Sequence, residues 1–430
     1  MDTARADTAA VPAGTRQRIV SVDILRGVVI VLMVLDHVRD FLHVSAYDFD
    51  PLDPARTTAI VYATRWVTHF CAPTFVFLAG ASAWLQRARG KGRAELARFL
   101  VTRGLWLVVL ELTVLGFGWS FSLPYLLFLQ VIWAIGWGMV LLAALLWLPR
   151  AAVLAVGVAI IAGHDLLDGI APNPFSPASA GWTLLYLPGV ISHAQVPLAL
   201  VIYPILPWFG VMALGYALGQ TFLEAPARRD RTFALLGVGM IVVFLLLRGF
   251  NLYGDPRPWA PQPTPGQSLM GFLNVQKYPP SLLYVCATLG PVLALVPLIE
   301  RWRGVTARLF LTFGAVPLFL YVVHVYVVHA VAILLRLATG QSIAGHDLLD
   351  GIAPGSFSSV SAGWTLLYVP GVLSHHDVPV ALVIYPILPW FGVMALGYAL
   401  GQTFLEAPAR RDRTFALLGV GMIVVFLLLR

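Results

Sequence analysis

Charge is the first thing that this sequence lacks. Only 11% of its 430 residues are Asp, Glu, Lys or Arg, whereas 59% are hydrophobic and the mean hydropathy is +0.82. Soluble domains carry about 25% charged residues, so the composition excludes a large soluble enzyme. The net charge of +7 does not indicate nucleic-acid binding, because the Arg residues fall in short connections between apolar runs, where membrane topology places them.

Cysteines and familiar catalytic motifs are also scarce. The two cysteines, Cys71 and Cys286, lie inside apolar runs, where we expect buried free thiols rather than a disulfide. The sequence has no phosphate-binding P-loop, no GxSxG nucleophile elbow, no HExxH motif and no cysteine pair with zinc-ligand spacing. We therefore expect no resident metal and no bound cofactor. The first 17 residues are polar and lack the apolar core of a signal peptide.

Long apolar runs fill most of the chain instead. Several approach or exceed the roughly 20 residues that cross a bilayer, and their length and continuity exclude a β-barrel. We predict an all-α, polytopic helix bundle embedded in a lipid bilayer. The expected spans are nine in a first unit and two after it: 22–43, 62–86, 99–118, 124–148, 150–167, 198–221, 232–249, 281–299 and 309–338, then 380–403 and 414–430.

The basic residues alternate along the connections between these spans. They gather before the first span and after the second, fourth, sixth and eighth, whereas the connections 119–123 and 168–197 contain neither Lys nor Arg. Because cytoplasmic loops are enriched in Lys and Arg, we predict a multi-pass membrane protein with residues 1–17 in the cytoplasm. His37 then lies at the outer end of the first span, and Arg26 near its inner end.

The chain also repeats part of itself. Residues 161–248 return as 343–430, and only nine of the 88 aligned positions differ. Repeat architectures usually show degenerate similarity at short periods. A copy this close therefore indicates a recent duplication or an error in how the sequence was assembled. We expect residues 18–342 to form the functional membrane domain, and 343–430 to add two spans without carrying the main chemistry.

The first span has the most informative spacing of polar residues. Arg26 and His37 are eleven residues apart, and eleven steps of about 100° return to within roughly 20° of the start. Both side chains therefore lie on one stripe of the helix, about 16 Å apart along its axis. Arg26 could pair with Asp23 three residues before it, or could meet an anionic group of a bound co-substrate at the cytoplasmic face.

Two carboxylates flank His37. Asp40, three residues on, could hydrogen-bond the His37 imidazole and fix its tautomer. Asp36 could instead pair with Arg39. Histidine suits proton transfer because its ordinary pKa is about 6.5, so His37 is the leading catalytic candidate, with Asp40 as its partner.

Other ionisable or polar residues fall at membrane depth, where they are costly and become functional candidates by default. His69 opens the second span on the same predicted side as His37 and is a further catalytic candidate. Glu111 lies deep in the third span, where a lone carboxylate either pairs with an Arg or His or handles protons. A lysine at a span entrance usually snorkels to the interface. The remaining candidates for substrate or proton handling are Asp36, Gln130, Lys277 and His324.

Several segments resemble a known family in the same order along roughly 16–338. They resemble bacterial membrane proteins related to the catalytic domain of heparan-α-glucosaminide N-acetyltransferase, and the spacing of Arg26 and His37 is similar to that of the wider transmembrane acyltransferases. The segments are SVDILRGVVIVLMVLDHVRDF, FCAPTFVFLAG, LQVIWAIGWGM, FLNVQKYPPSLLY and PLFLYVVHVYVVH.

This resemblance implies a membrane acyltransferase of the bacterial plasma membrane. It would move an acyl group, commonly acetyl from cytosolic acetyl-CoA, to a sugar or glycan on the outer side, with acyl-CoA as a co-substrate. By resemblance, His37 handles the acyl group or acts as general base, and Arg26 assists near the donor. The alternative is a proton-coupled transporter or a lipid-handling protein in which Glu111 and the histidines relay protons. A homo-oligomer is compatible with both.

Overall fold

The structure is a computed structural model of the chain that describes residues 19–42, 49–122, 125–170, 172, 177–193, 196–339, 371–375 and 378–383. The chain divides into two compact units. The first comprises residues 1–120 and 125–353, and the second comprises 121–124 and 354–430. Every site residue predicted from the sequence lies in the first unit.

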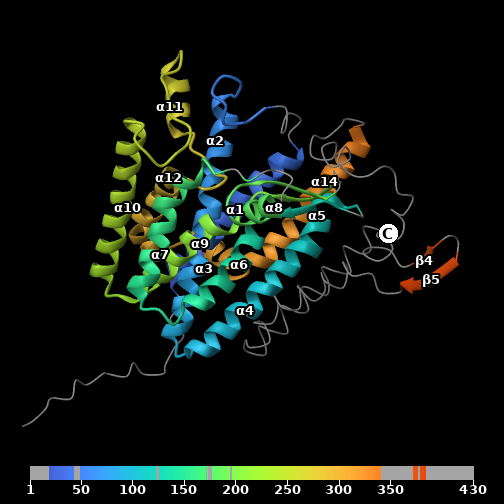
Figure 1. Cartoon of the computed structure of the whole chain (residues 1–430), viewed down its shortest axis with the longest axis horizontal. Coiled ribbons are helices and arrows are strands. Elements are labelled where there is room, and N and C mark those ends of the chain that lie inside the picture. Colours follow the sequence, from blue (N-terminus) through green and yellow to red (C-terminus); the bar gives the residue numbers. More distant parts are fainter. Residues whose placement is uncertain are drawn as a thin grey trace, which may run out of the picture. The chain divides into compact units, whose positions relative to one another are not determined.

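The first unit is a helix bundle in which the short helices α2 and α11 project at the same end (Figure 1). Its described helices are α1 (Val20–Leu42), α2 (Ala59–Val67), η1 (Thr68–Phe70), α3 (Cys71–Ala88), α4 (Arg93–Leu110), η2 (Glu111–Leu115), α5 (Gly116–Ser120), α6 (Val131–Leu145), α7 (Arg150–Gly163), η3 (His164–Leu167), α8 (Pro177–Leu185), α9 (Ile205–Leu218), η4 (Gly219–Leu223), α10 (Pro226–Gly249), α11 (Pro265–Leu273), α12 (Leu282–Arg301), α13 (Val305–Ala315) and α14 (Pro317–Thr339).

Side-chain caps fix where several of these helices begin. The hydroxyls of Thr58, Thr264 and Ser281 accept hydrogen bonds from backbone N–H groups three residues on, which are otherwise left without partners at a helix start. Helices α10 and α11 have proline at their first helical position. Proline favours a helix start there because it has no backbone N–H that would be left without a hydrogen-bond partner.

The prediction of an all-α polytopic bundle is confirmed. Within the described residues, six helical segments are long and apolar enough to cross a membrane. Helix α1 is long enough but carries several charges, and α6 has only 15 residues. The six segments are Ala59–Ala88, Arg93–Ser120, Arg150–Leu167, Ile205–Leu223, Pro226–Gly249 and Leu282–Arg301.

The expected ninth span, 309–338, is wrong as a single helix. Helices α13 and α14 meet there at an angle of 87°. The break falls at Val316 and Pro317, because proline lacks the N–H needed to continue the helix and disfavours a helical conformation in the residue before it.

Two other expected spans begin with strands. Strand β1 (Leu127–Leu129) starts the expected span 124–148, and β3 (Val196–Val201) starts the expected span 198–221. Together with β2 (Gly189–His193) they form a sheet in the order β1-β3-β2, in which β1 and β3 are parallel and β2 and β3 antiparallel. A short apolar run cannot by itself distinguish a buried strand from a buried helix, and prolines at 197 and 204 delay the helix until Ile205.

The repeated segment forms the same hairpin a second time. Strands β4 (Gly371–His375) and β5 (Val378–Val383) pair antiparallel with the register and the irregularity of β2 and β3. Residues 380–383 of the expected span 380–403 therefore lie in a strand. The rest of that span, the expected span 414–430 and residues 1–17 lie outside the described residues.

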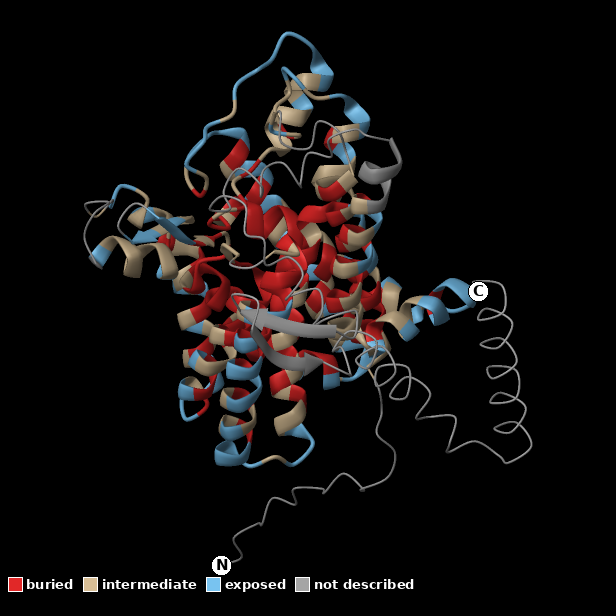
Figure 2. Ribbon diagram, turned by 90° about the vertical axis from the view of Figure 1, so that its right-hand side faces the viewer, coloured by how far each residue is buried: buried red, intermediate tan, exposed pale blue. Residues whose placement is uncertain are grey.

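Glycines allow the central helices to approach very closely. A Cβ on Gly27 of α1 would lie 1.9 Å from the carbonyl oxygen of Phe310 in α13, and a Cβ on Gly215 of α9 would lie 2.0 Å from that of Phe77 in α3. Such small-residue contacts are typical of helix packing in membranes. Buried residues accordingly fill the middle of the bundle, and exposed ones lie at its ends and periphery (Figure 2).

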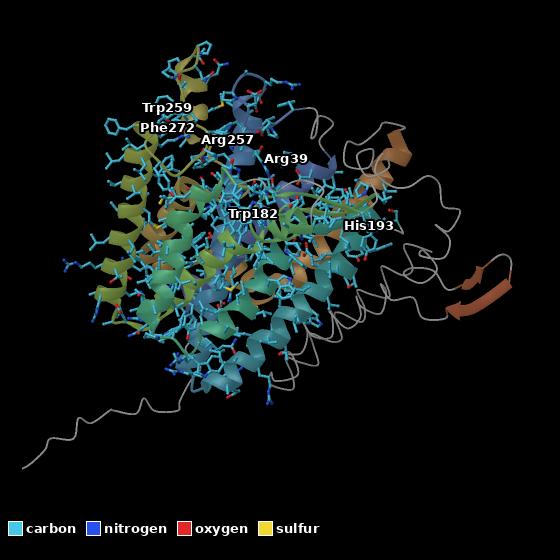
Figure 3. All side chains as sticks on the ribbon, in the orientation of Figure 1. Arg39, Trp182, His193, Arg257, Trp259 and Phe272 are labelled. Carbon is cyan, nitrogen blue, oxygen red and sulfur yellow. The ribbon has the colours of Figure 1, made fainter. Side chains whose placement is uncertain are left out.

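The segment 252–281 forms a cap at the end of the bundle and is organised around Arg248. The Arg248 guanidinium donates hydrogen bonds of 2.6–3.0 Å to four backbone carbonyls of the cap, those of Arg257, Gly271, Phe272 and Asn274. Figure 3 shows Arg257, Trp259 and Phe272 close together there, and the last two rings are 5.2 Å apart. The cap also contacts α2, because the Tyr62 hydroxyl donates to the carbonyl of Met270.

Candidate functional site

The second half of α1 brings its polar residues into the interior of the bundle. Asp36 and His37 are each only 8% exposed, although the apolar run before them resembles an ordinary membrane helix. Helices α2, α5 and α14 and the segment leading into α12 supply the side chains around them. These elements are distant in sequence, so the site depends on the tertiary fold.

His37 is paired with His324 of α14. The Nδ1 atom of His37 lies 2.6 Å from Nε2 of His324, and the two rings stack with centroids 4.8 Å apart. His324 Nδ1 is 2.9 Å from the carbonyl oxygen of Leu320, one turn earlier in α14.

These contacts determine the proton positions in the neutral pair. A carbonyl only accepts, so Nδ1 of His324 carries the hydrogen and its Nε2 is an acceptor. Nδ1 of His37 must then be the donor, and Nε2 of His37 retains the lone pair. The arrangement can therefore present His37 Nε2 as a base or a nucleophile.

Aromatic rings surround this histidine pair. The ring of Trp119 in α5 meets His37 edge-on at 4.9 Å, and that of Tyr321 in α14 meets it edge-on at 6.2 Å. Phe41, one turn after His37, stacks on Trp119 at 5.1 Å. Aromatic contacts restrict the orientation of the imidazole and keep it in an apolar setting.

Asp36 is held by two arginines. Both of its oxygens lie 2.8 Å from Nη1 of Arg65 in α2, and one lies 2.8 Å from Nη2 of Arg39. The predicted pair between Asp36 and Arg39 is thus present. The predicted hydrogen bond from Asp40 to the His37 imidazole is wrong, because Asp40 lies 2.5 Å from Nη2 of Arg39, and the His37 Nδ1 that it would fix is bonded to His324.

His69, Lys277 and Tyr278 lie near the same ion pairs. His69 in η1 is 1% exposed, and neither of its ring nitrogens has a hydrogen-bond partner among the described residues. Lys277 is 7% exposed, acts electrostatically on Asp36 and His37, and places its ammonium 5.1 Å from the centre of the Tyr278 ring. Burial opposes ionisation of Tyr278, but Lys277 and Arg65 outweigh it, so the pKa of this phenol lies below its ordinary value.

Glu111 and Gln130 belong to a different contact. Glu111 is 1% exposed and begins the short π-helical turn η2. One of its carboxylate oxygens accepts a 2.9 Å hydrogen bond from the backbone N–H of Gln130, the residue before α6. The expected partner of Glu111 was an Arg or His side chain; the partner found is the start of a helix, where a carboxylate is favoured by the helix dipole.

A cavity of about 480 Å³ lies at the other end of α1. Arg26 lines it and makes the predicted contact with Asp23 at 3.4 Å, while its other terminal nitrogen donates to the hydroxyl of Ser82 in α3. Arg89 and Lys91 add two more cations to the lining. This end of the helix can therefore accept an anionic group of considerable size.

The sequence analysis missed several residues of the site. Arg65 interrupts an expected span, and that interruption was the signal that could have revealed it. Trp119 carries no comparable signal, because aromatic residues are common in the core. Among the described residues, no group of three or more His, Cys, Asp or Glu is placed to hold a metal ion.

Comparison with known families gives one match. The sequence model described as the catalytic region of heparan-alpha-glucosaminide N-acetyltransferase matches residues 18–251 and 293–427. It therefore extends beyond the expected limit of 338 and includes most of the copy, but it leaves out 252–292, where Lys277 and Tyr278 lie. A search of curated proteins found no match. Because the matched residues make up most of the chain, the protein belongs to the heparan-α-glucosaminide N-acetyltransferase catalytic-domain family.

Proposed function

We propose that the protein is a membrane-embedded acyltransferase that moves an acyl group, acetyl in the simplest case, from acyl-CoA to a sugar or glycan acceptor. Family membership supports a transmembrane acetyltransferase in general terms. The observation that carries the proposal is the bonded pair of His37 and His324. It presents a lone pair on a helix whose other end lines a large basic cavity.

His37 Nε2 takes the proton from an acceptor amine or hydroxyl as that atom attacks the thioester carbonyl. The carbon–sulfur bond then breaks, the coenzyme A sulfur leaves, and the proton passes from His37 to the thiolate. His324 keeps the Nδ1 hydrogen of His37 in place throughout, because its own Nε2 accepts that hydrogen. Asp36 and Asp40 contribute negative charge on the same helix, held by Arg39 and Arg65.

The cavity at Arg26 is the proposed entrance for the donor. Arg26, Arg89 and Lys91 would bind the phosphates of coenzyme A, since charge-assisted contacts to phosphate are among the stronger hydrogen bonds. Arg26 and His37 are about 16 Å apart along α1, a separation that the extended pantetheine arm of the donor would bridge.

We further propose that residues 1–17 and this cavity face the cytoplasm of a bacterium, and that the 252–281 cap faces outward. The alternating Arg distribution supports that orientation. An N-terminal reporter that is active only in the cytoplasm should be active, and an enzyme reporter that works only outside should be silent. The opposite result would reverse the orientation.

A proton-coupled transporter is the second candidate, and one observation bears on it. One carboxylate oxygen of Glu111 is buried without a hydrogen-bond partner among the described residues, which suits a proton carrier. However, its other oxygen caps α6, so a structural role already explains the residue. The acyltransferase therefore remains the better-supported function.

The test is release of coenzyme A by the purified full chain in detergent, with acetyl-CoA as donor and glucosamine as acceptor. His37→Ala should lower kcat by about 10²–10⁴-fold, whereas His193→Ala, an exposed histidine on β2 (Figure 3), should leave kcat unchanged. If His37→Ala keeps the wild-type turnover and His69→Ala is inactive, the catalytic role would move to His69. Failure of the wild type to turn over any acyl donor would refute the proposal.

A further inference from the structure

The buried charges near His37 do not balance. Arg39, Arg65 and Lys277 supply three cations, and Asp36 and Asp40 supply two anions. The side chains of the paired residues are 11–25% exposed, and Lys277 is 7% exposed. With His37 and His324 neutral, one positive charge remains in excess, and protonation of His37 would add to it. Unpaired buried charge is strongly unfavourable.

Hydrogen-bond donors are also left over in this cluster. The Nε and Nη1 atoms of Arg39 are buried without hydrogen-bond partners among the described residues. Lys277 makes no hydrogen bond or ion pair with any side chain that the structure describes, and its ammonium lies beside the Tyr278 ring. A buried donor that stays unpaired costs about 1–3 kcal/mol. The excess of positive charge and the shortage of hydrogen-bond acceptors are two separate observations. One anionic group would provide both the negative charge and the acceptors.

We propose that Arg39 and Lys277 form a recognition site for an anionic group, a carboxylate or a phosphate, on the acceptor substrate. The identity of that molecule as the acceptor rests on the proposed function, because the site lies beside His37 rather than beside the basic cavity at Arg26. Binding of the anion itself does not depend on acyl transfer.

Two other anions could offset the excess charge. Tyr278, whose pKa is lowered by Lys277 and Arg65 against the effect of burial, could ionise and serve as the counter-ion. Alternatively, Lys277 could stabilise the oxyanion that forms during acyl transfer. In the first case an added anion leaves the Tm of the wild type unchanged and raises that of Tyr278→Phe, which lacks the phenolate. In the second, loss of Lys277 slows transfer to every acceptor equally.

Binding is tested first, without any donor. Thermal unfolding of the purified full chain in detergent is followed with glucuronate and with glucose, which share a ring and differ in the carboxylate. Glucuronate should raise the Tm of the wild type and glucose should not. The shift should disappear in Lys277→Gln and persist in Lys277→Arg, in Tyr278→Phe and in the control Arg228→Gln, whose side chain is 79% exposed.

Transfer is tested second, with acetyl-CoA and either glucosamine or glucosamine 6-phosphate. The wild type should prefer the phosphorylated sugar by tenfold or more in kcat/KM, and Lys277→Gln should remove that preference. If glucuronate raises the Tm but the wild type shows no preference for the phosphorylated sugar, the site would be assigned to carboxylates alone. The proposal is overturned if the wild type shows the same Tm with both sugars in the binding assay and the same kcat/KM with both acceptors in the transfer assay. It is also overturned if Lys277→Gln loses rate equally with both acceptors. If no transfer occurs at all, the binding assay still decides.

Discussion

A single nitrogen of Arg65 lies 2.8 Å from both carboxylate oxygens of Asp36, and this contact joins α2 to α1. Arg65→Met leaves that buried carboxylate with Arg39 as its remaining partner. Breaking one side of a buried ion pair typically costs about 3–5 kcal/mol, so we expect a clear fall in the Tm of the purified protein.

The double variant Asp36→Asn with Arg65→Met provides the control for this prediction. It removes both charges of the contact, so it should recover part of the stability that Arg65→Met loses. Equal Tm values for the wild type and Arg65→Met would mean that the contact contributes nothing to stability.

His324 is expected to act by positioning His37. In His324→Ala the Nδ1 hydrogen of His37 has no acceptor, so the imidazole can rotate or adopt its other tautomer. We expect kcat for acyl transfer to fall by about tenfold or more, with little change in the KM for acyl-CoA. His324→Gln, whose amide oxygen can still accept, should retain more activity than His324→Ala. Equal activities in the two variants would mean that the hydrogen bond to His37 is not what matters.

Local spacing predicted some of this site, and tertiary pairing hid the rest. The contacts of Arg26 with Asp23 and of Arg39 with Asp36 are three residues apart on one helix, so helical geometry alone placed them together. The pairing of His37 with His324 joins residues 287 positions apart, and no helical period can indicate such a contact.

The fold was likewise predicted only in part. Apolar length identified the membrane helices, because the bilayer imposes it. It failed at β1, β3 and the break at Pro317, where the apolar runs continue through strands or a bend. Prolines marked these places in the sequence, but hydropathy alone does not register the backbone conformation that a proline imposes.

The basic cavity gives a prediction about donor affinity. Arg89→Gln and Lys91→Gln each remove a cation from its lining, so each should raise the KM for acetyl-CoA by about threefold to tenfold with kcat nearly unchanged. Because these are partly exposed charges, the wild-type KM should also rise with salt. Arg228→Gln, whose side chain is 79% exposed and paired with Glu224, is the matched control. Unchanged KM values in both lining variants would place the donor elsewhere.

Gly314 gives a prediction about packing. A Cβ at this position of α13 would lie 1.7 Å from the carbonyl oxygen of Asp23 in α1. Gly314→Ala therefore forces the two helices apart, at a cost of about 1–3 kcal/mol or more, and should lower Tm. Gly239→Ala in α10, where a Cβ meets nothing within 4 Å, should leave Tm unchanged or raise it. A wild-type Tm for Gly314→Ala would show that α13 can move away from α1 without loss.

The two copies of the repeated segment allow an unusually well-matched deletion experiment. Deleting 343–430 should leave a protein that inserts into the membrane and keeps its acyl-transfer activity, because the proposed catalytic, donor and anion-binding residues all lie between 26 and 324. Deleting 161–248 removes almost the same sequence but takes away α9, whose Trp208 and Tyr216 are fully buried and whose backbone lies against α3 at Gly80. Loss of so much packed surface should abolish folding, which we would measure as loss of the monodisperse peak in detergent chromatography. Survival of that variant would mean that the second copy can replace the first, and loss of insertion on deleting 343–430 would mean that the second copy completes the bundle.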